Sequence, residues 1–116
     1  MNDDGSRSRY VNCLTGTQLH RLAYREWGDP ANPRVVVCVH GLTRNSRDFG
    51  PLGRALSDRW RVIAADMPGR GASERLADPM LYQVPTYVAN AVTLLARLDV
   101  ETVDWVGISL GGLMGM

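Results

Sequence analysis

Hydrophobic and polar residues alternate along the first part of the chain and then give way to short apolar runs. The alternation over Leu19–Trp27 predicts a strand with one buried face, paired with a second strand near Tyr10–Leu14. The runs at Val35–His40, Arg61–Asp66 and Thr102–Ile108 are nearly all apolar and rich in β-branched residues. Strands buried on both faces have this composition, and they usually belong to parallel sheets.

Helical periodicity fills the gaps between these runs. Pro51 can open a short helix, and a longer one follows Pro85. The apolar positions of the longer helix recur at helical spacing: Val84, Tyr87, Val88, Ala91, Leu94, Leu95 and Leu98. A third helix is expected to begin just after Ser109. The order ββ followed by βαβαβα predicts an α/β fold with a mostly parallel sheet and helices on both faces.

The start of the chain and its cysteines bear on domain organisation and compartment. The opening "MNDDGSRSR" has no apolar core of the kind a secretory signal needs, so we expect residues 1–9 to be a disordered tail and residues 10–116 to belong to one domain. No apolar stretch reaches the length of a membrane span. Cys13 and Cys38 lack the spacing of metal ligands, and the position of Cys38 inside the apolar run "VVVCVH" predicts a buried thiol. We therefore expect a cytoplasmic protein with no membrane partner, metal or cofactor.

Composition and charge exclude several classes of function. The 116 residues are 45% hydrophobic, and 13 basic against 12 acidic residues give a net charge of +1, which indicates no polyanionic partner such as nucleic acid. All the basic residues are arginine. The absence of lysine excludes Schiff-base chemistry and a Walker lysine within this chain. Nothing in the sequence specifies an oligomeric state.

One motif places a serine between glycines at the end of a buried strand. Gly107-Ile108-Ser109-Leu110-Gly111 fits G-x-S-x-G and stands where a strand is expected to turn sharply into a helix. Such a turn lifts the serine oxygen clear of the backbone, and the helix N-terminus behind it favours negative charge on a bound oxygen. The pattern indicates a nucleophilic serine.

A second segment fits the same chemistry. A serine nucleophile needs two hydrogen-bond donors for the oxyanion of its tetrahedral intermediate. One would be the N–H of Leu110, the residue after Ser109, and the other would come from a loop after an earlier strand. In "HGLTRNSRDFG", Gly41 allows that loop a close approach and Leu42 would supply the N–H.

Three motifs in this order resemble a known family. "VHGLTRNSRDF", "AADMPGRGASE" and "VGISLGG" together resemble the amino-terminal half of an α/β-hydrolase, from about Tyr10 to Met116. The resemblance implies that Ser109 is the nucleophile and that Leu42 and Leu110 frame the oxyanion hole. The family's D-x-x-G-x-G-x-S loop appears as Asp66, Gly69, Gly71 and Ser73. Where many members carry His, this chain has Arg70, to which we assign a loop-shaping role and no chemistry.

Serine at the elbow narrows the expected reaction. Family members that open epoxides or displace halide carry Asp there, so the chain resembles the esterase-like branch. We expect hydrolysis of an ester or related acyl bond of a small-molecule substrate, through an acyl-enzyme on Ser109. Carbon–carbon bond hydrolysis and lactone opening are neighbouring reactions.

The triad partners of such a serine are missing from these residues. In this fold an acid and then a histidine follow the serine, yet "LGGLMGM" contains neither. His20 is expected to be a surface or hairpin residue, and His40 to shape the oxyanion loop. Asp66 and Asp104 precede the elbow, where the resemblance gives them no triad role. We therefore expect a fold truncated after the nucleophile elbow, a fragment with little or no turnover alone.

The same truncation would leave Thr102–Ile108 as an apolar edge strand, because its next neighbour in the family's sheet comes from later sequence. We expect the isolated chain to be poorly soluble, or stable only when a complementary segment covers that edge.

Two other hypotheses of function are alternatives to a hydrolase. One is a non-catalytic α/β-hydrolase-like binding module that a partner chain completes. The other is nucleotide binding, because "PGRGASE" imitates part of a G-x-G-x-x-G fingerprint. That segment follows the second buried strand, and Glu74 replaces the third glycine, so the loop geometry of the hydrolase family is the better account.

Overall fold

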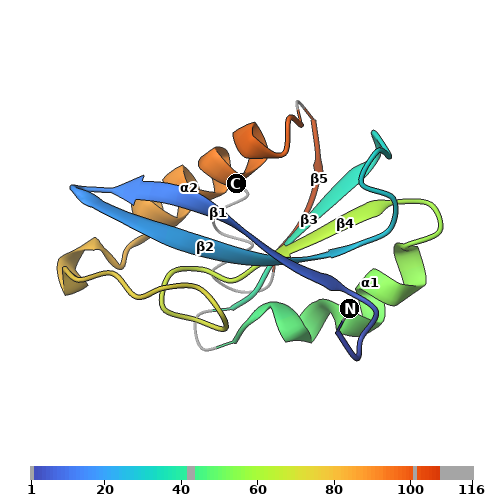
Figure 1. Cartoon of the computed structure of the whole chain (residues 1–116), viewed down its shortest axis with the longest axis horizontal. Helices are drawn as coiled ribbons and strands as arrows, with labels where there is room; N and C mark the ends of the chain where they lie inside the picture. The colour runs from blue at the N-terminus through green and yellow to red at the C-terminus, as the bar shows by residue number, and fades with distance from the viewer. Residues whose placement is uncertain (1, 42–43, 101, 108–116) are drawn as a thin grey trace.

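The computed structural model describes residues 2–41, 44–100 and 102–107 (Figure 1). Its strands are β1 (Arg7–Thr15), β2 (Gln18–Trp27), β3 (Val35–Val39), β4 (Arg61–Ala65) and β5 (Asp104–Gly107). Its helices are α1 (Gly50–Leu56) and α2 (Val84–Arg97), with short 3₁₀ turns η1 (Ser46–Phe49) and η2 (Pro79–Leu81). The elements follow the predicted order, with boundaries that differ by one to three residues at most ends.

The strands form one mixed sheet in the order β1-β2-β4-β3-β5. Strands β4, β3 and β5 are parallel, whereas β2 pairs antiparallel with both β1 and β4. Val39 lies opposite Ala65 of β4 on one side and Gly107 of β5 on the other. The carboxyl ends of the three parallel strands are therefore level, and the loops that follow them leave from the same edge of the sheet.

The two helices cover opposite faces of the sheet, as predicted (Figure 1). Alternate residues of the central strands point to opposite faces because the side-chain period of a strand is two. The face toward α2 contains Val35, Val37, Val39, Ile63 and Ala65, packed with Tyr87 and Leu94 of the helix. The face toward α1 contains Val36, Cys38, Val62 and Ala64, packed with Trp27, Phe49, Leu52 and Leu56. Both faces are buried, which explains the continuous apolar runs in the sequence.

The expected disordered tail over residues 1–9 does not match the structure from residue 2 onward. Asn2 donates a backbone hydrogen bond to the Ser6 carbonyl at 2.8 Å, and Gly5 donates one to the Asn2 carbonyl at 2.9 Å. The Asp4 carboxylate accepts from the Ser6 amide at 3.0 Å. This turn buries Ser6 completely and leads into β1, which begins at Arg7. The polar composition that predicted disorder instead supplies the hydrogen bonds of the turn.

A buried carboxylate holds the start of β1 against the rest of the sheet. Glu26 of β2 is almost fully buried and forms ion pairs with Arg7 at 3.2 Å, Arg9 at 3.1 Å and Arg61 at 2.7 Å. Burial alone would raise the pKa of Glu26, but the hydrogen bonds and charges of Arg61 and Arg7 outweigh it and lower the pKa. One ionised side chain thus connects β1, β2 and β4.

Helix α2 begins after Gln83, with Pro85 in its first turn, where a missing N–H costs nothing. Its buried residues are Thr86, Tyr87, Asn90, Ala91 and Leu94. Val88, which the periodicity placed on the apolar face, lies at its margin and is exposed. In the described part of the chain, neither this helix nor any other has the length and apolar character that a membrane crossing requires.

Candidate active site

The candidate site lies at the edge of the sheet where β3, β4 and β5 end. His40 and Gly41 follow β3, Asp66 and Met67 follow β4, and β5 ends at Gly107. In open α/β sheets, ligands bind outside the carboxyl ends of the strands. The three strands that precede the sequence motifs therefore end where this architecture places its chemistry.

The three residues predicted to act directly, Ser109, Leu42 and Leu110, lie outside the described residues. The expected third helix falls outside them as well. The strand that leads to the elbow is described, and it is shorter than the predicted Thr102–Ile108 because it spans Asp104–Gly107.

His40 is fully buried and both of its ring nitrogens are bonded to backbone atoms. Nε2 accepts from the Met67 amide at 3.0 Å, and Nδ1 lies 2.6 Å from the Gly41 carbonyl oxygen. A backbone N–H can only donate, so Nε2 carries no proton and Nδ1–H donates to Gly41. This arrangement agrees with the predicted loop-shaping role, and it leaves His40 no nitrogen available to act as a general base.

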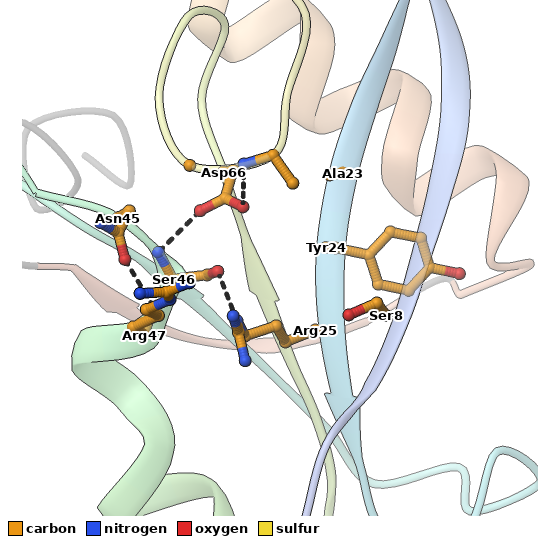
Figure 2. Close-up of a pocket in the computed structure, with 10 residues that line it drawn as sticks. Ser8, Ala23, Tyr24, Arg25, Asn45, Ser46, Arg47 and Asp66 are labelled. Atoms are coloured by element: carbon orange, nitrogen blue, oxygen red, sulfur yellow. Dashed lines mark hydrogen bonds between the residues drawn. The ribbon is translucent and has the colours of Figure 1, made fainter. Parts of the chain in front are cut away.

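The Asp66 carboxylate joins two loops (Figure 2). Oδ1 accepts from the Ser46 amide at 2.7 Å, and Oδ2 accepts from the Ala72 amide at 3.1 Å. Gly71 has a φ of +51°, and a Cβ atom at that position would lie 2.3 Å from the Asp66 carboxyl carbon. The motif's second glycine is therefore required both by backbone conformation and by the space that the carboxylate occupies.

Ser73, the last residue of the same motif, fixes the loop to the neighbouring hairpin. Its hydroxyl donates to the Asp66 carbonyl at 2.5 Å and accepts from the Ala23 amide of β2 at 2.8 Å. The Asp66 amide in turn donates to the Ala23 carbonyl at 2.9 Å. Ser73 is buried and both functions of its hydroxyl are used within the fold.

Arg70 has the loop-shaping contacts that the sequence predicted. Nη1 donates to the Pro68 carbonyl at 3.0 Å and to the Tyr87 hydroxyl at 2.9 Å. The guanidinium lies 5.8 Å from the ring centroid of Tyr82 and 5.3 Å from that of Tyr87, within the range of cation–π attraction. Arg70 thus connects the loop after β4 to the start of α2.

A polar cavity of about 360 Å³ adjoins the Asp66 loop (Figure 2). Its lining residues are Ser8, Ala23, Tyr24, Arg25, Asn45, Ser46, Arg47, Asp66, Gly71 and Ala72. Within it, Arg25 donates to the Ser46 hydroxyl at 3.1 Å and to Asp4 at 2.9 Å. The sequence analysis assigned no role to Arg25 or Ser46: Arg25 lies outside the three motifs, and Ser46 lies within "VHGLTRNSRDF" at a position without an evident function. Asp66 and Gly71 were identified as residues of the D-x-x-G-x-G-x-S loop.

His20 lies in the hairpin, as predicted, but the alternative of a surface position is wrong. The ring is buried, with Nε2 2.7 Å from the Thr15 hydroxyl, which also accepts from the Asn90 amide at 3.2 Å. Burial occurs because α2, which carries Asn90, packs on this hairpin. Burial lowers the pKa of His20, and the charge of Glu74 opposes part of that shift.

The two cysteines are buried free thiols. Burial raises the pKa of Cys38 to about 12, so this thiol is not ionised at neutral pH. Among the described residues, no three His, Cys, Asp or Glu side chains are grouped closely enough to hold a metal ion.

Comparison with known families identifies the class. The family model described as alpha/beta hydrolase fold matches residues 34–116, which include β3, the Asp66 loop and the whole G-x-S-x-G segment. The chain belongs to the alpha/beta hydrolase fold family, and the predicted fold class is confirmed.

Individual relatives are similar over nearly the whole chain. A 3-hydroxybutyrate-oligomer hydrolase from Cupriavidus necator is 58% identical over 110 residues, which are 95% of this chain and 38% of the relative. A serine hydrolase-like protein from Danio rerio is 37% identical over 86 residues, 74% of this chain and 26% of the relative. A solved alpha/beta hydrolase structure from Novosphingobium aromaticivorans has a TM-score of 0.85 and 40% identity, covering 96% of this chain and 38% of that one. The chain therefore spans less than half the length of these proteins.

Proposed function

We propose that the protein is a serine hydrolase that cleaves ester bonds in short oligomers of a 3-hydroxy acid. The observation that carries this proposal is the 58% identity to a 3-hydroxybutyrate-oligomer hydrolase across 95% of this chain. The matched region covers 110 of the 116 residues and therefore most of the strands and loops that frame the candidate site. The class of reaction is acyl transfer to water, with Ser109 as the nucleophile.

In this mechanism the Ser109 oxygen attacks the ester carbonyl carbon while a base removes the serine proton. The tetrahedral intermediate carries its negative charge on the former carbonyl oxygen, which the N–H groups of Leu42 and Leu110 stabilise. The C–O bond to the alcohol breaks, and the base returns the proton to the departing alkoxide. Water then attacks the acyl-enzyme, which releases the carboxylic acid and restores the serine.

The register of the sheet supports this assignment. Gly107 of β5 pairs with Val39 of β3, and adjacent strands lie about 4.8 Å apart. Ser109 follows Gly107 by two residues, and Leu42 follows Val39 by three. Both connections are short, and they begin at the same level of adjacent strands. This arrangement favours a nucleophile and an oxyanion donor that lie close together.

In this proposal the base is a histidine other than the two in these 116 residues. Both nitrogens of His40 are bonded to the backbone, and His20 is buried under α2 at the hairpin. We propose that an acid and a histidine outside these residues complete the triad. The 116-residue chain alone then has little or no turnover beyond what an oxyanion hole can supply without a base.

The test uses the full-length protein with a 3-hydroxybutyrate trimer as substrate and acid release as the readout. We expect turnover, labelling by a fluorophosphonate probe, and loss of both in Ser109→Ala, with kcat reduced by about 10⁴-fold or more. Ser57→Ala is the matched control, because the Ser57 hydroxyl donates to the Arg54 carbonyl at the end of α1, before β4 begins. Unchanged turnover in Ser109→Ala would overturn the proposal. Cleavage of simple acyl esters without cleavage of the trimer would overturn the substrate class alone.

A further inference from the structure

A second cavity lies beside the loop that follows β4. Its volume is about 390 Å³, within the range of about 300–1,000 Å³ that is usual for small-molecule sites. The described residues that line it come from this loop, from the segment after η2 and from α2: Pro68, Gly69, Arg70, Arg75, Tyr82 and Tyr87. Two of these six residues are cationic, two carry a phenolic hydroxyl, and none is acidic.

A hydrogen bond of the main chain brings the two arginines to the same cavity. The Gly69 amide donates to the Glu74 carbonyl at 3.0 Å, which places Arg75 beside the turn that carries Arg70. The Glu74 carboxylate accepts from the Arg21 amide at 2.7 Å and from its Nε at 3.3 Å, so this neighbouring negative charge is engaged by β2. The cavity wall therefore has an excess of positive charge.

Both tyrosine hydroxyls in the wall keep a proton that they can donate. The Tyr82 hydroxyl accepts from the Leu76 amide at 2.7 Å, and the Tyr87 hydroxyl accepts from Nη1 of Arg70 at 2.9 Å. An N–H group can only donate, so neither bond uses the proton of the hydroxyl itself. Toward the described residues, neither hydroxyl donates a hydrogen bond. The cavity thus combines positive charge with hydroxyl donors, which suits an anion.

Arg75 is the residue of this wall best placed to recognise a ligand. Its side chain is exposed and forms no hydrogen bond or ion pair with the described residues, while its carbonyl accepts from Nε2 of Gln18 at 3.0 Å. The backbone is therefore held in place and the guanidinium is available. A guanidinium presents paired N–H donors that match the two oxygens of a carboxylate.

We propose that this cavity binds the carboxylate group of a 3-hydroxy acid, with Arg75 as the residue that recognises it and the hydroxyls of Tyr82 and Tyr87 as further donors. The charge of Arg70 adds to the attraction. The identity of the acid rests on the proposed function, whereas the preference for an anion follows from the cavity itself. The carboxylate has two sources, which are the terminus of the oligomer and the free acid that hydrolysis releases.

Titration calorimetry of the full-length protein with 3-hydroxybutyrate tests the carboxylate site without any turnover. We expect this acid to bind and 1,3-butanediol, which has the same carbon skeleton and no carboxylate, not to bind. Arg75→Gln should weaken the binding of 3-hydroxybutyrate about tenfold or more, because a bond between two ionised groups is lost. Equal affinities in Arg75→Gln and the unsubstituted protein would overturn the site, and so would equal binding of the diol.

Arg59→Gln is the matched control for this titration. Arg59 is also exposed, and its carbonyl also accepts from a side-chain amide, that of Asn32 at 2.8 Å. It lies in the turn between α1 and β4 and not among the residues that line this cavity. The substitution removes the same charge, so an equal loss of affinity in both variants would assign binding to net charge and overturn the role of Arg75.

Two substrates distinguish the sources of the carboxylate. One is the 3-hydroxybutyrate trimer with a free terminal carboxyl group, and the other is the same trimer with that group converted to a primary amide. If the oligomer terminus occupies the cavity, the ratio of the two kcat/KM values favours the acid, and this ratio falls about tenfold or more in Arg75→Gln but not in Arg59→Gln. A ratio that is the same in Arg75→Gln, together with Arg75-dependent binding of 3-hydroxybutyrate, would assign the cavity to the released acid.

The outcomes separate this inference from the proposed function. If Ser109→Ala keeps its turnover, the proposed function fails, and calorimetry still decides whether a carboxylate binds at Arg75. If Ser109→Ala abolishes turnover but neither 3-hydroxybutyrate binding nor the ratio of acid to amide turnover depends on Arg75, the carboxylate site is wrong and the serine hydrolase stands.

Discussion

The two histidines show how the same residue type acquires different properties from its hydrogen bonds. Both are buried in the fold, yet His40 has both ring nitrogens bonded to backbone groups, whereas His20 is bonded through Nε2 alone. Within the described part of the chain, Nδ1 of His20 has no hydrogen-bond partner. A proton added to His20 would therefore create a buried charge with no acceptor for its second N–H.

Protonation of His20 is expected to destabilise the fold. Burial lowers the pKa of His20 in the folded state, so the unfolded chain, with an ordinary pKa near 6.5, binds a proton first as the pH falls. The free energy of unfolding should decrease below about pH 6.5, by at most about 1.4 kcal/mol per pH unit for one proton. Urea unfolding at pH 7.5, 6.5 and 5.5 measures this slope, and His20→Gln should reduce it.

Other groups act in a different pH range. The carboxylates with lowered pKa values, Asp4 and Glu26 among them, contribute stability that is lost only as the pH falls through about 4 and below. An unchanged slope between pH 7.5 and 5.5 in His20→Gln would contradict the assignment to His20.

The sequence could not reveal that His20 is buried. The alternating pattern correctly placed it in a hairpin, but α2, a helix more than sixty residues later, packs on that hairpin and brings Asn90 to Thr15, the partner of His20. Periodicity reports which residues share a face and does not report what packs on that face.

At the scale of elements, the strands were predictable because their composition is strongly biased. β3 and β4 differ from the expected ranges by one residue, since β-branched runs buried on both faces have few alternatives. The start of β1 was missed by three residues. It depends on Glu26 of β2, which forms ion pairs with Arg7 and Arg9 of β1 through tertiary contacts that no local pattern encodes.

The contact of α1 with the sheet depends on one glycine. A Cβ atom at Gly53 would lie 2.3 Å from Cδ2 of the buried Trp27, so the helix and the indole are in direct backbone contact. We expect Gly53→Ala to destabilise the protein by roughly 1–2 kcal/mol, because an overpacking cost of up to about 3 kcal/mol outweighs the gain of about 1 kcal/mol in helix propensity. Thermal and urea unfolding of the purified protein measure the change.

Gly50→Ala is the matched control in the same helix. Among the described residues, the atom nearest to its Cβ would be Cβ of Asp4 at 3.5 Å, so the substitution should be neutral or slightly stabilising. Equal stability of Gly53→Ala and the unsubstituted protein would show that Trp27 can move away, and that the close approach is not required.

At the scale of the molecule, the sequence predicted where the candidate site lies better than what holds it together. The three motifs were expected at strand ends, and the parallel register brings those ends level at Val39, Ala65 and Gly107. The contact between Asp66 and Ser46 joins residues twenty positions apart through the sheet order β4-β3. Local motifs do not encode such contacts, so the residues that hold the two loops together are found only in the structure.

The same sheet order places β5 at an edge of the described sheet, where β3 is its one partner. Exposed edges of this kind pair with other chains unless charge or a bulge blocks them. The opposite edge, β1, carries the exposed Arg9, whereas β5 has its exposed charge, Asp104, at its first residue and presents Val106, 36% exposed, further along. We expect the isolated 116-residue polypeptide to associate through β5, with a mass in sedimentation velocity that increases with concentration.

A charge introduced on the edge strand distinguishes association through β5 from non-specific association. Val106→Lys should raise the monomer fraction of the 116-residue polypeptide several-fold, because a lysine on an edge strand opposes the approach of another strand. Val92→Lys, at a 60% exposed position on α2, adds the same charge away from the edge and should have little effect. A monomeric polypeptide that unfolds in one sharp transition would contradict the prediction. Equal effects of the two lysines would assign association to net charge, because only a strand-pairing route depends on where the charge is placed.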